Sequence, residues 1–171
     1  MNKYSIISVI AIAVIVTTIL YGVWGIYSVH QLQIRAEKEG FSYFDLANYE
    51  KIKVCNPTSF FVTFSDFTIR MYYLDDLKGE FKIGPNSLGP NSSEILDLDF
   101  SSDSFSEAQY LFMHMDGQFK GEVPIRLNPN EMKISTTYET KIIGVIPYEQ
   151  TIIKSGFEFT QMMNDDISCK D

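Results

Sequence analysis

Histidine and cysteine are scarce in this chain, which limits the chemistry it can perform. The 171 residues include two histidines and two cysteines. His30 and His114 are far apart, and neither has another His or Cys at zinc-ligand spacing, so a zinc site is not expected. No loop has the ligand spacing of a calcium site, and no two carboxylates have the contrasting environments that acid–base catalysis needs. We predict a non-enzymatic protein with no catalytic residue, no metal site and no cofactor.

Clusters of basic residues are also missing. Lys and Arg total 14 against 22 Asp and Glu, for a formal net charge of -8, and the basic residues are scattered along the sequence. Proteins that bind nucleic acid neutralise its phosphates with grouped Lys and Arg. Nucleic acid is therefore excluded as a partner, and the acidity is interpreted as a solubilising surface.

Charge is absent altogether from residues 4–34, which contain no Lys, Arg, Asp or Glu. Within this window, about 22 residues from Ile6 to Tyr27 would form a helix of roughly 33 Å, enough to cross a hydrocarbon core of about 30 Å. We therefore predict a transmembrane anchor helix from Ile6 to Val29 that contacts the lipid bilayer. A cleaved secretory signal is the alternative, but signals have shorter apolar regions and a small-residue cleavage site. Here the apolar run ends in aromatic residues typical of the headgroup level.

Charge alone does not fix the orientation of this helix. Lys3 precedes it, while Arg35 and Lys38 follow it, so the positive-inside count is nearly a tie. Two observations favour an extracytoplasmic domain: Asn91 begins an Asn-Ser-Ser pattern for N-glycosylation, and the cysteine count is even. The predicted location is the cell membrane, with a single span and the soluble domain outside.

One folded domain is expected after the anchor. About 130 residues remain beyond the region around the span, which is the usual size of a domain with a single core. The predicted organisation, in residue numbers, is a short N-terminal tail (1–5), the anchor helix (6–29), a juxtamembrane linker (30–42), a β-sandwich domain (43–162) and a flexible C-terminal tail (163–171).

Short runs of alternating apolar and polar residues predict that strands dominate this domain. Turn-forming Gly, Pro, Asn and Asp residues separate them, about ten residues per strand and turn. Asp97 and Asp99 are expected on an exposed strand face. The apolar positions expected to point inward are Ile52 and Val54; Phe67, Ile69, Met71 and Tyr73; Phe81 and Ile83; Leu96, Leu98 and Phe100; Val123, Ile125 and Leu127; Met132, Ile134 and Tyr138; and Phe157 and Phe159.

One segment has helical rather than alternating periodicity. Apolar residues recur at helical intervals from Phe105 to Met115, Ser104 and Glu107 match a capping box, and Gly117 is placed to end the helix. The predicted fold class is therefore mainly β, an antiparallel β-sandwich with one amphipathic helix, preceded by an N-terminal transmembrane helix.

The order of these segments resembles the late-embryogenesis-abundant type 2 family, also called the water-stress and hypersensitive-response domain. The motifs that carry the resemblance are an Asn-Pro turn at Asn56 and Pro57, an aromatic strand, further strands, a proline-containing loop and a helix, over about residues 43–127. The chain is also similar to the membrane-anchored, archaeal type of desiccation-related protein. The resemblance implies an immunoglobulin-like or fibronectin-III-like sandwich without catalytic residues, and a role in water stress or desiccation.

Cys55 and Cys169 are candidates for a disulfide bond if the domain lies outside the cell. The bond would tie the C-terminal tail to the first strand, and closing so long a loop would stabilise the fold by roughly 4–5 kcal/mol on the chain-entropy model. The alternative is two unrelated thiols, because a bridge requires Cα atoms within about 7 Å and Cys169 lies in a tail expected to fray.

Two functions from different classes remain open. In the first, the chain is a membrane-anchored protein that binds or shields other components of the cell envelope under water stress. Its contact residues would be exposed aromatics such as Tyr72, Phe61 and residues 41–44, although core packing is the favoured interpretation of aromatic residues. In the second, the chain is a structural or accessory subunit of an envelope or membrane complex, assembled with protein partners through its span and a sheet edge.

Overall fold

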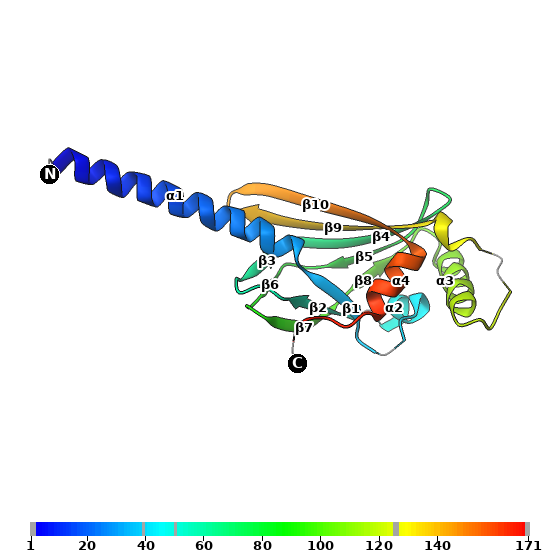
Figure 1. Ribbon diagram of the computed structural model, residues 1–171. Helices are drawn as coiled ribbons and strands as arrows, with labels where there is room; N and C mark the ends of the chain where they lie inside the picture. Colours follow the sequence, from blue (N-terminus) through cyan, green and yellow to red (C-terminus); the bar gives the residue numbers. More distant parts are fainter. Residues whose placement is uncertain (1–2, 39, 50, 125–126, 170–171) are drawn as a thin grey trace.

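A projecting helix and a set of antiparallel sheets make up the computed structural model, which describes residues 3–38, 40–49, 51–124 and 127–169 (Figure 1). The helix, α1 (Lys3–His30), has no proline to interrupt its hydrogen bonds. Most of its apolar side chains are exposed, and from Ile6 to His30 it is long and apolar enough to cross a membrane. The predicted apolar helix is confirmed, and it ends at His30 rather than at Val29.

Ten strands form three antiparallel sheets in the described residues. The largest has the order β10 (Ile146–Ser155), β9 (Met132–Ile142), β4 (Asp66–Tyr73), β5 (Asp76–Ile83) and β8 (Asp99–Ser101). A second sheet has the order β1 (Gln33–Ala36), β2 (Lys51–Asn56) and β7 (Ser92–Asp97), and β3 (Val62–Phe64) pairs with β6 (Asn86–Leu88). The prediction of a mainly antiparallel β domain is confirmed.

A single hydrophobic cluster is shared by the sheets and the helices. The alternation predicted for β2, β4, β5 and β9 is confirmed at the following inward positions, which are buried: Ile52, Val54, Phe67, Ile69, Met71, Phe81, Ile83, Met132, Ile134 and Tyr138. Tyr73, also predicted to point inward, is only partly buried. Asp97 and Asp99 are exposed as expected. Side chains from α1 also join this cluster, because Val29 is buried in it. The domain core therefore begins inside the helix predicted to be only an anchor.

The helix predicted around Phe105 is confirmed and begins directly after Ser104, but the predicted capping box and the predicted end at Gly117 are wrong. In α3 (Phe105–Phe119), the Ser104 side chain makes no capping bond, and the Glu107 carboxylate instead lies 3.7 Å from Lys78 Nζ. Gly117 is buried within the last turns, where a Cβ would lie 2.9 Å from a methyl of Val123. Its role is close packing, and Gly121, with a φ of +72°, follows the helix C-cap at Lys120.

The prediction of a single helix in the domain is also wrong, because α2 (Tyr43–Tyr49), the 3₁₀ turn η1 (Pro129–Glu131) and α4 (Gly156–Asn164) are present. The segment around Phe157 and Phe159 was predicted as a strand. It is the helix α4, because Ser155 and Glu158 form a reciprocal capping box. No strand forms in the described residues between α3 and η1, where Val123 and Leu127 lie in a loop and Ile125 falls outside the described residues.

A local cap and a long-range contact together begin α2, since Ser42 Oγ accepts a hydrogen bond from the Asp45 backbone N–H at 3.0 Å. The Asp116 carboxylate accepts hydrogen bonds from the Tyr43 and Phe44 backbone N–H groups, at 2.8 and 2.9 Å, and from Ser42 Oγ, at 2.8 Å. Burial raises the pKa of Asp116, and these hydrogen bonds oppose that rise only in part. Burial likewise raises the pKa of Tyr43, whose hydroxyl donates to the Gly156 carbonyl at 2.7 Å. The hydrogen bonds of Asp116 therefore join α2 to α3, and the Tyr43 hydroxyl joins α2 to α4.

The predicted linker and tail are both part of the folded domain. The segment 30–42 contains β1, which pairs with β2 from Gln33 to Ala36. In the C-terminal segment, the Asp166 carboxylate pairs with Arg35 at 3.1 Å, and the Ser168 backbone N–H donates to Gln33 Oε1 at 2.8 Å. The prediction of a free tail from 163 is wrong for the described residues up to 169, because β1 gives that tail partners.

Candidate functional site

A groove of about 590 Å³ lies beside the C-terminal half of α1 and is called here the α1 groove. One wall is formed by α1 residues, including Tyr21, Trp24 and Ile26. The opposite walls come from the loop around Phe60 and from the hairpin between β9 and β10. The α1 groove therefore lies where the apolar helix enters the domain (Figure 1).

Close packing holds α1 against this wall. A Cβ added to Gly22 would lie 2.8 Å from Ile142 Cγ2, so glycine lets the helix and the hairpin approach each other. The Trp24 and Phe60 rings stack with centroids 4.7 Å apart and an interplanar angle of 25°, an arrangement that adds to the stabilisation from buried area. The end of α1 is thus packed onto two separate parts of the domain.

Two polar contacts fix the same junction. The Ser28 side chain is fully buried, and its Oγ is hydrogen-bonded to Thr58 Oγ1 at 3.2 Å. Near the end of α1, His30 Nε2 is hydrogen-bonded to the Tyr148 hydroxyl at 2.7 Å. His30, which follows the predicted span, thus contacts β10 in the structure. The helix cannot be removed without exposing groups that the domain now covers.

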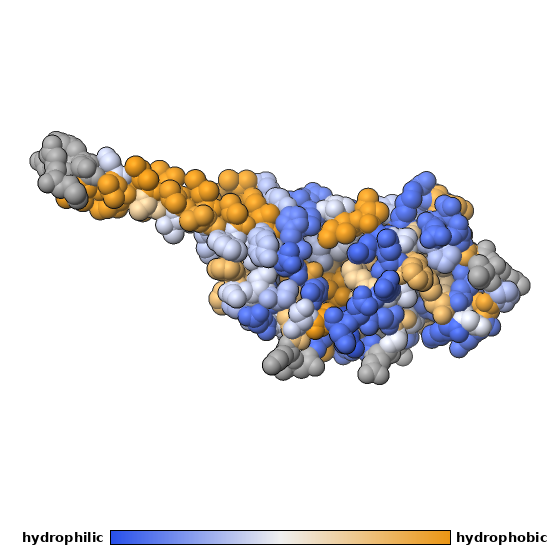
Figure 2. Space-filling model, in the orientation of Figure 1, coloured by the Kyte–Doolittle hydropathy of each residue, from blue (hydrophilic) through white to orange (hydrophobic). Residues whose placement is uncertain are grey.

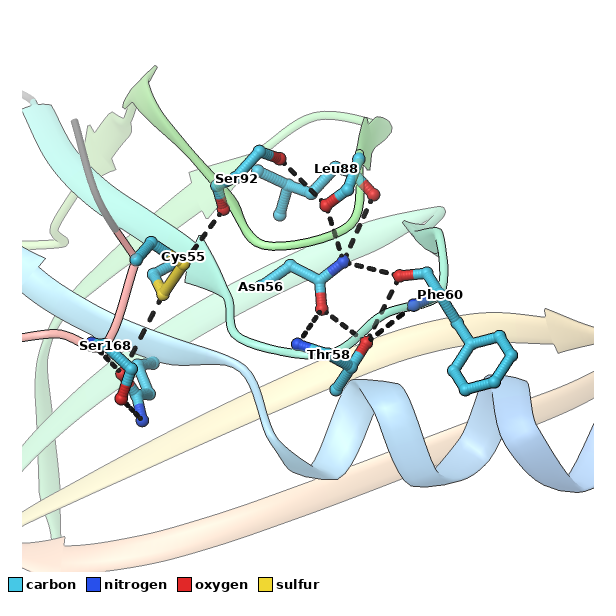
Figure 3. The surroundings of a disulfide bond; sticks show 10 residues. Cys55, Asn56, Thr58, Phe60, Leu88, Ser92 and Ser168 are labelled. Atoms are coloured by element: carbon cyan, nitrogen blue, oxygen red, sulfur yellow. Dashed lines mark hydrogen bonds between the residues drawn. A yellow bond between two sulfur atoms is a disulfide. The ribbon is translucent and has the colours of Figure 1, made fainter.

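Asn56 supports the loop that lines the α1 groove (Figure 3). Its Nδ2 donates to the carbonyls of Phe60 and Gly89, both at 2.7 Å, and its Oδ1 accepts from Thr58 N at 3.1 Å and Thr58 Oγ1 at 2.8 Å. Asn56 is fully buried, so these bonds satisfy groups that water does not reach. The Asn-Pro turn, noted in the sequence for its family resemblance, thereby holds two loops together.

A disulfide bond joins Cys55 to Cys169, with an S–S distance of 1.98 Å and a Cα–Cα distance of 5.8 Å. It lies next to Asn56 and ties the C-terminal segment to β2 (Figure 3). The alternative of two unrelated thiols does not describe this structure. The two cysteines are 114 residues apart in the sequence. The bond therefore anchors β2, the strand that ends at Asn56.

The hairpin tip, residues 142–146, has an unusual turn. Ile143 and Gly144 have φ angles of 55° and 74°, and the Val145 N–H donates to the Ile142 carbonyl at 3.2 Å. Positive φ at both central residues is typical of a type I′ turn, in which Asn-Gly is strongly preferred. A β-branched residue at positive φ is an outlier, and left-handed backbone costs about 1–2 kcal/mol per residue. Ile143 therefore adopts a backbone conformation that is unfavourable for a β-branched residue.

Apolar residues are exposed around the α1 groove. Val145 is 75% exposed, Ile146 53% and Phe61 68%. Figure 2 shows apolar residues covering the projecting part of α1, whereas hydrophilic residues cover much of the visible face of the domain. Exposed apolar side chains grouped together mark contact sites on soluble domains.

The described lining of the α1 groove is mainly apolar. Lys141 is the one lysine among its described lining residues, and no carboxylate or histidine is included. Shifted pKa values occur elsewhere and have structural causes. At Glu80, for example, burial would raise the pKa, but hydrogen bonds from Lys82 and Arg70 lower it. The α1 groove is thus mainly apolar, and Lys141 is the one cation in its described lining.

The other residues singled out from the sequence do not join this site. The His114 ring packs against Tyr110 in a tilted arrangement, with centroids 4.1 Å apart, and no three His, Cys, Asp or Glu side chains are grouped for a metal among the described residues. Asp75 pairs with Lys133 and Asp97 with Lys51. Asn91 is exposed with a φ of 47°, and its glycosylation remains a prediction.

The aromatic candidates separate into two groups. Phe41 and Tyr43 are buried, so core packing is the correct interpretation for them. Tyr72 is half-buried, while Phe61 is exposed and lines the α1 groove. The hairpin tip was not recognised in the sequence, although its uncharged run between Lys141 and Glu149 was a usable signal. The chain matches no protein-family model and no curated protein.

Proposed function

We propose that this chain is a single-pass, membrane-anchored, non-enzymatic β-sandwich protein that has a protective or binding role at the cell envelope. The carrying observation is that the exposed apolar helix α1 continues without a break into the domain core and forms one wall of an apolar groove there. The protective role is that of the late-embryogenesis-abundant type 2 family, which the sequence resembles, and water stress is its setting.

Retention of the helix is supported by its packing. A signal peptidase cut after Tyr27 would remove Trp24 from Phe60 and Gly22 from Ile142, and would place the new terminus beside the fully buried Ser28. Cleaved signals do not contribute to the core of the mature domain. The predicted anchor therefore has a structural role beyond targeting.

The extracytoplasmic orientation is supported by the disulfide bond between Cys55 and Cys169. Such bonds persist in oxidising compartments and are rare in the cytosol. The bilayer is then the partner of α1, and the domain stands on its outer surface. An immunoglobulin-like sandwich is the proposed class of the domain, supported by two antiparallel sheets of three and five strands that share one core.

Vesicle drying tests the protective role. Phosphatidylcholine vesicles filled with a fluorescent dye and carrying the full chain are dried and rehydrated, and dye leakage is measured. We expect less leakage than from empty vesicles, and a loss of this protection in Phe61→Ser, which alters an exposed residue of the α1 groove. Tyr110→Ser is the matched control, since Tyr110 is an exposed aromatic on α3. Equal leakage with and without the wild-type chain would contradict a protective role.

The accessory-subunit function has one observation in its favour. β10 lies at the end of the five-stranded order, and Ile153 on it is 68% exposed, with Phe157 exposed just beyond it. Long edge strands with exposed apolar residues are templates for pairing with another chain. Purification in mild detergent without cross-linking separates the alternatives, because an accessory subunit would be isolated with stoichiometric partners and a protective protein would be isolated alone.

A further inference from the structure

We infer that the hairpin tip, residues 142–146, is inserted into the outer leaflet beside α1, so that the domain is seated on the membrane by two contacts and lipid chains fill the α1 groove. This rests on the proposed function in one respect, namely that α1 spans the bilayer. The bilayer that α1 crosses is therefore the partner of both the hairpin tip and the α1 groove. The juxtaposition of Gly22 and Ile142 carries the inference.

The depth of Gly22 along the helix sets the depth of the hairpin tip. At 1.5 Å rise per residue, Gly22 lies about 24 Å along α1 from Ile6. A hydrocarbon core is about 30 Å thick, so a core that begins at Ile6 extends beyond Gly22. Ile142 and Ile143 contact the Gly22 position, and the hairpin tip lies beside α1 in Figure 1. The hairpin tip is therefore level with the outer edge of the hydrocarbon.

The side chains of the hairpin tip match this environment. Val145 is 75% exposed and Ile146 53%, and residues 142–147 carry no charge. Lys141, an exposed residue of the α1 groove lining, precedes this run, and its ammonium group can reach lipid phosphates while its stem remains in the apolar region. An apolar tip with a flanking cation is the pattern of segments that lie in the membrane interface.

The turn conformation gives an independent reason. Ile143 occupies a positive φ of 55° at a position where Asn would be unstrained. Residues held in unfavourable backbone regions cluster at functional sites. A lipid contact explains why an aliphatic side chain is retained there, because Asn at the same place would put an amide among acyl chains.

Site-directed fluorescence tests the inference on the full chain. A single cysteine at Val145 is labelled with an environment-sensitive dye, since the native cysteines are joined to each other. The protein is then placed in vesicles of phosphatidylcholine and phosphatidylglycerol with or without nitroxide-bearing acyl chains. We expect a blue-shifted emission and its loss with nitroxide lipids. Met113→Cys is the matched control, since Met113 is an exposed apolar residue on α3 at the other end of the domain, and its dye should be neither shifted nor quenched.

Trp24, the single tryptophan, reports on the helix in the same samples. Quenching of Trp24 by nitroxide lipids together with an unquenched dye at position 145 would overturn the hairpin contact and leave the span intact. An unquenched Trp24 together with an unquenched dye would overturn both. The variant Ile143→Asn adds a second readout, because Asn suits the turn and should fold. We expect it to weaken the quenching of the dye at position 145, and unchanged quenching would contradict a role for Ile143 in lipid contact.

Discussion

Gly22 and Ile142 are in such close approach that a single added methyl group on the glycine would lie 2.8 Å from Ile142 Cγ2. This contact joins a helix of membrane-spanning length to a β-hairpin far along the sequence. Gly25, one turn further along α1, has open space at the same position. The two glycines therefore provide a matched pair of substitutions.

We expect Gly22→Ala to destabilise the protein by about 1–3 kcal/mol relative to Gly25→Ala, because overpacking forces neighbouring groups to move. The gain in helix propensity is the same for both changes and cancels in the comparison. Denaturation of both variants in the same detergent micelles measures the difference. Equal stabilities would mean that α1 is not held against the hairpin.

Removal of the Asn56 side chain should weaken the fold. Asn56→Ala removes two hydrogen bonds, to the carbonyls of Phe60 and Gly89, and takes the acceptor Asn56 Oδ1 from the buried Thr58 N–H. Each lost bond costs about 0.5–1.5 kcal/mol, and a buried donor left unsatisfied costs about 1–3 kcal/mol. We expect a loss of about 3 kcal/mol in the free energy of unfolding. The exposed Asn130 provides the control, since Asn130→Ala should change stability by less than about 0.5 kcal/mol.

The disulfide bond is expected to resist alkylation until it is reduced. Cys55 is fully buried, so the protein is first unfolded in denaturant, and the mass shift on alkylation is measured with and without reductant. We expect no labelling without reductant and two labels with it. Replacement of both cysteines by Ser should lower stability by about 4–5 kcal/mol, given a loop of 114 residues. Full labelling without reductant would rule out the bond.

Asp116 should make stability depend on pH in weak acid. Burial raises its pKa in the folded protein above the ordinary value of 3.8, so the folded state binds this proton more tightly than the unfolded chain does. The resulting stabilisation is fully present below the ordinary value and is lost as the pH rises through the raised pKa.

Comparison with Asp116→Asn isolates this group, because the asparagine does not titrate. As the pH rises through this window, the wild-type protein should lose stability relative to the variant, and the difference should become constant above it. Chemical denaturation of both proteins at several pH values gives the measurement. A constant difference over the whole range would show that the pKa of Asp116 is not raised by folding.

Local patterns in the sequence predicted the strands with one buried face and missed those without one. The alternation of Phe67, Ile69 and Met71 identified β4, because these residues form one fully buried face, whereas the opposite face is buried only at Thr68. β10 lies at a sheet edge and has no fully buried residue, and its apolar residues do not alternate with polar ones. Phe157 and Phe159 look like a strand over three residues, yet the capping box at Ser155 begins a helix there.

The candidate site was less predictable, because it depends on contacts between distant segments. The apolar span and the Asn-Pro turn were visible in the sequence, but the partners of Asn56 at Leu88 and Gly89 lie 32 and 33 residues away. Likewise, nothing local to Gly22 indicates that Ile142 packs on it. The capping of α2 by Asp116 was missed for the same reason, since Ser42 is 74 residues away.

Extraction of membranes with alkaline carbonate, followed by intact-mass analysis of the protein that stays with the lipid, tests most directly whether an uncleaved α1 anchors the folded domain. We expect the chain to remain in the membrane pellet and its mass to include α1. Release of the full chain into the supernatant, or a mature chain that begins beyond Tyr27, would contradict an anchored domain with a groove at the lipid boundary.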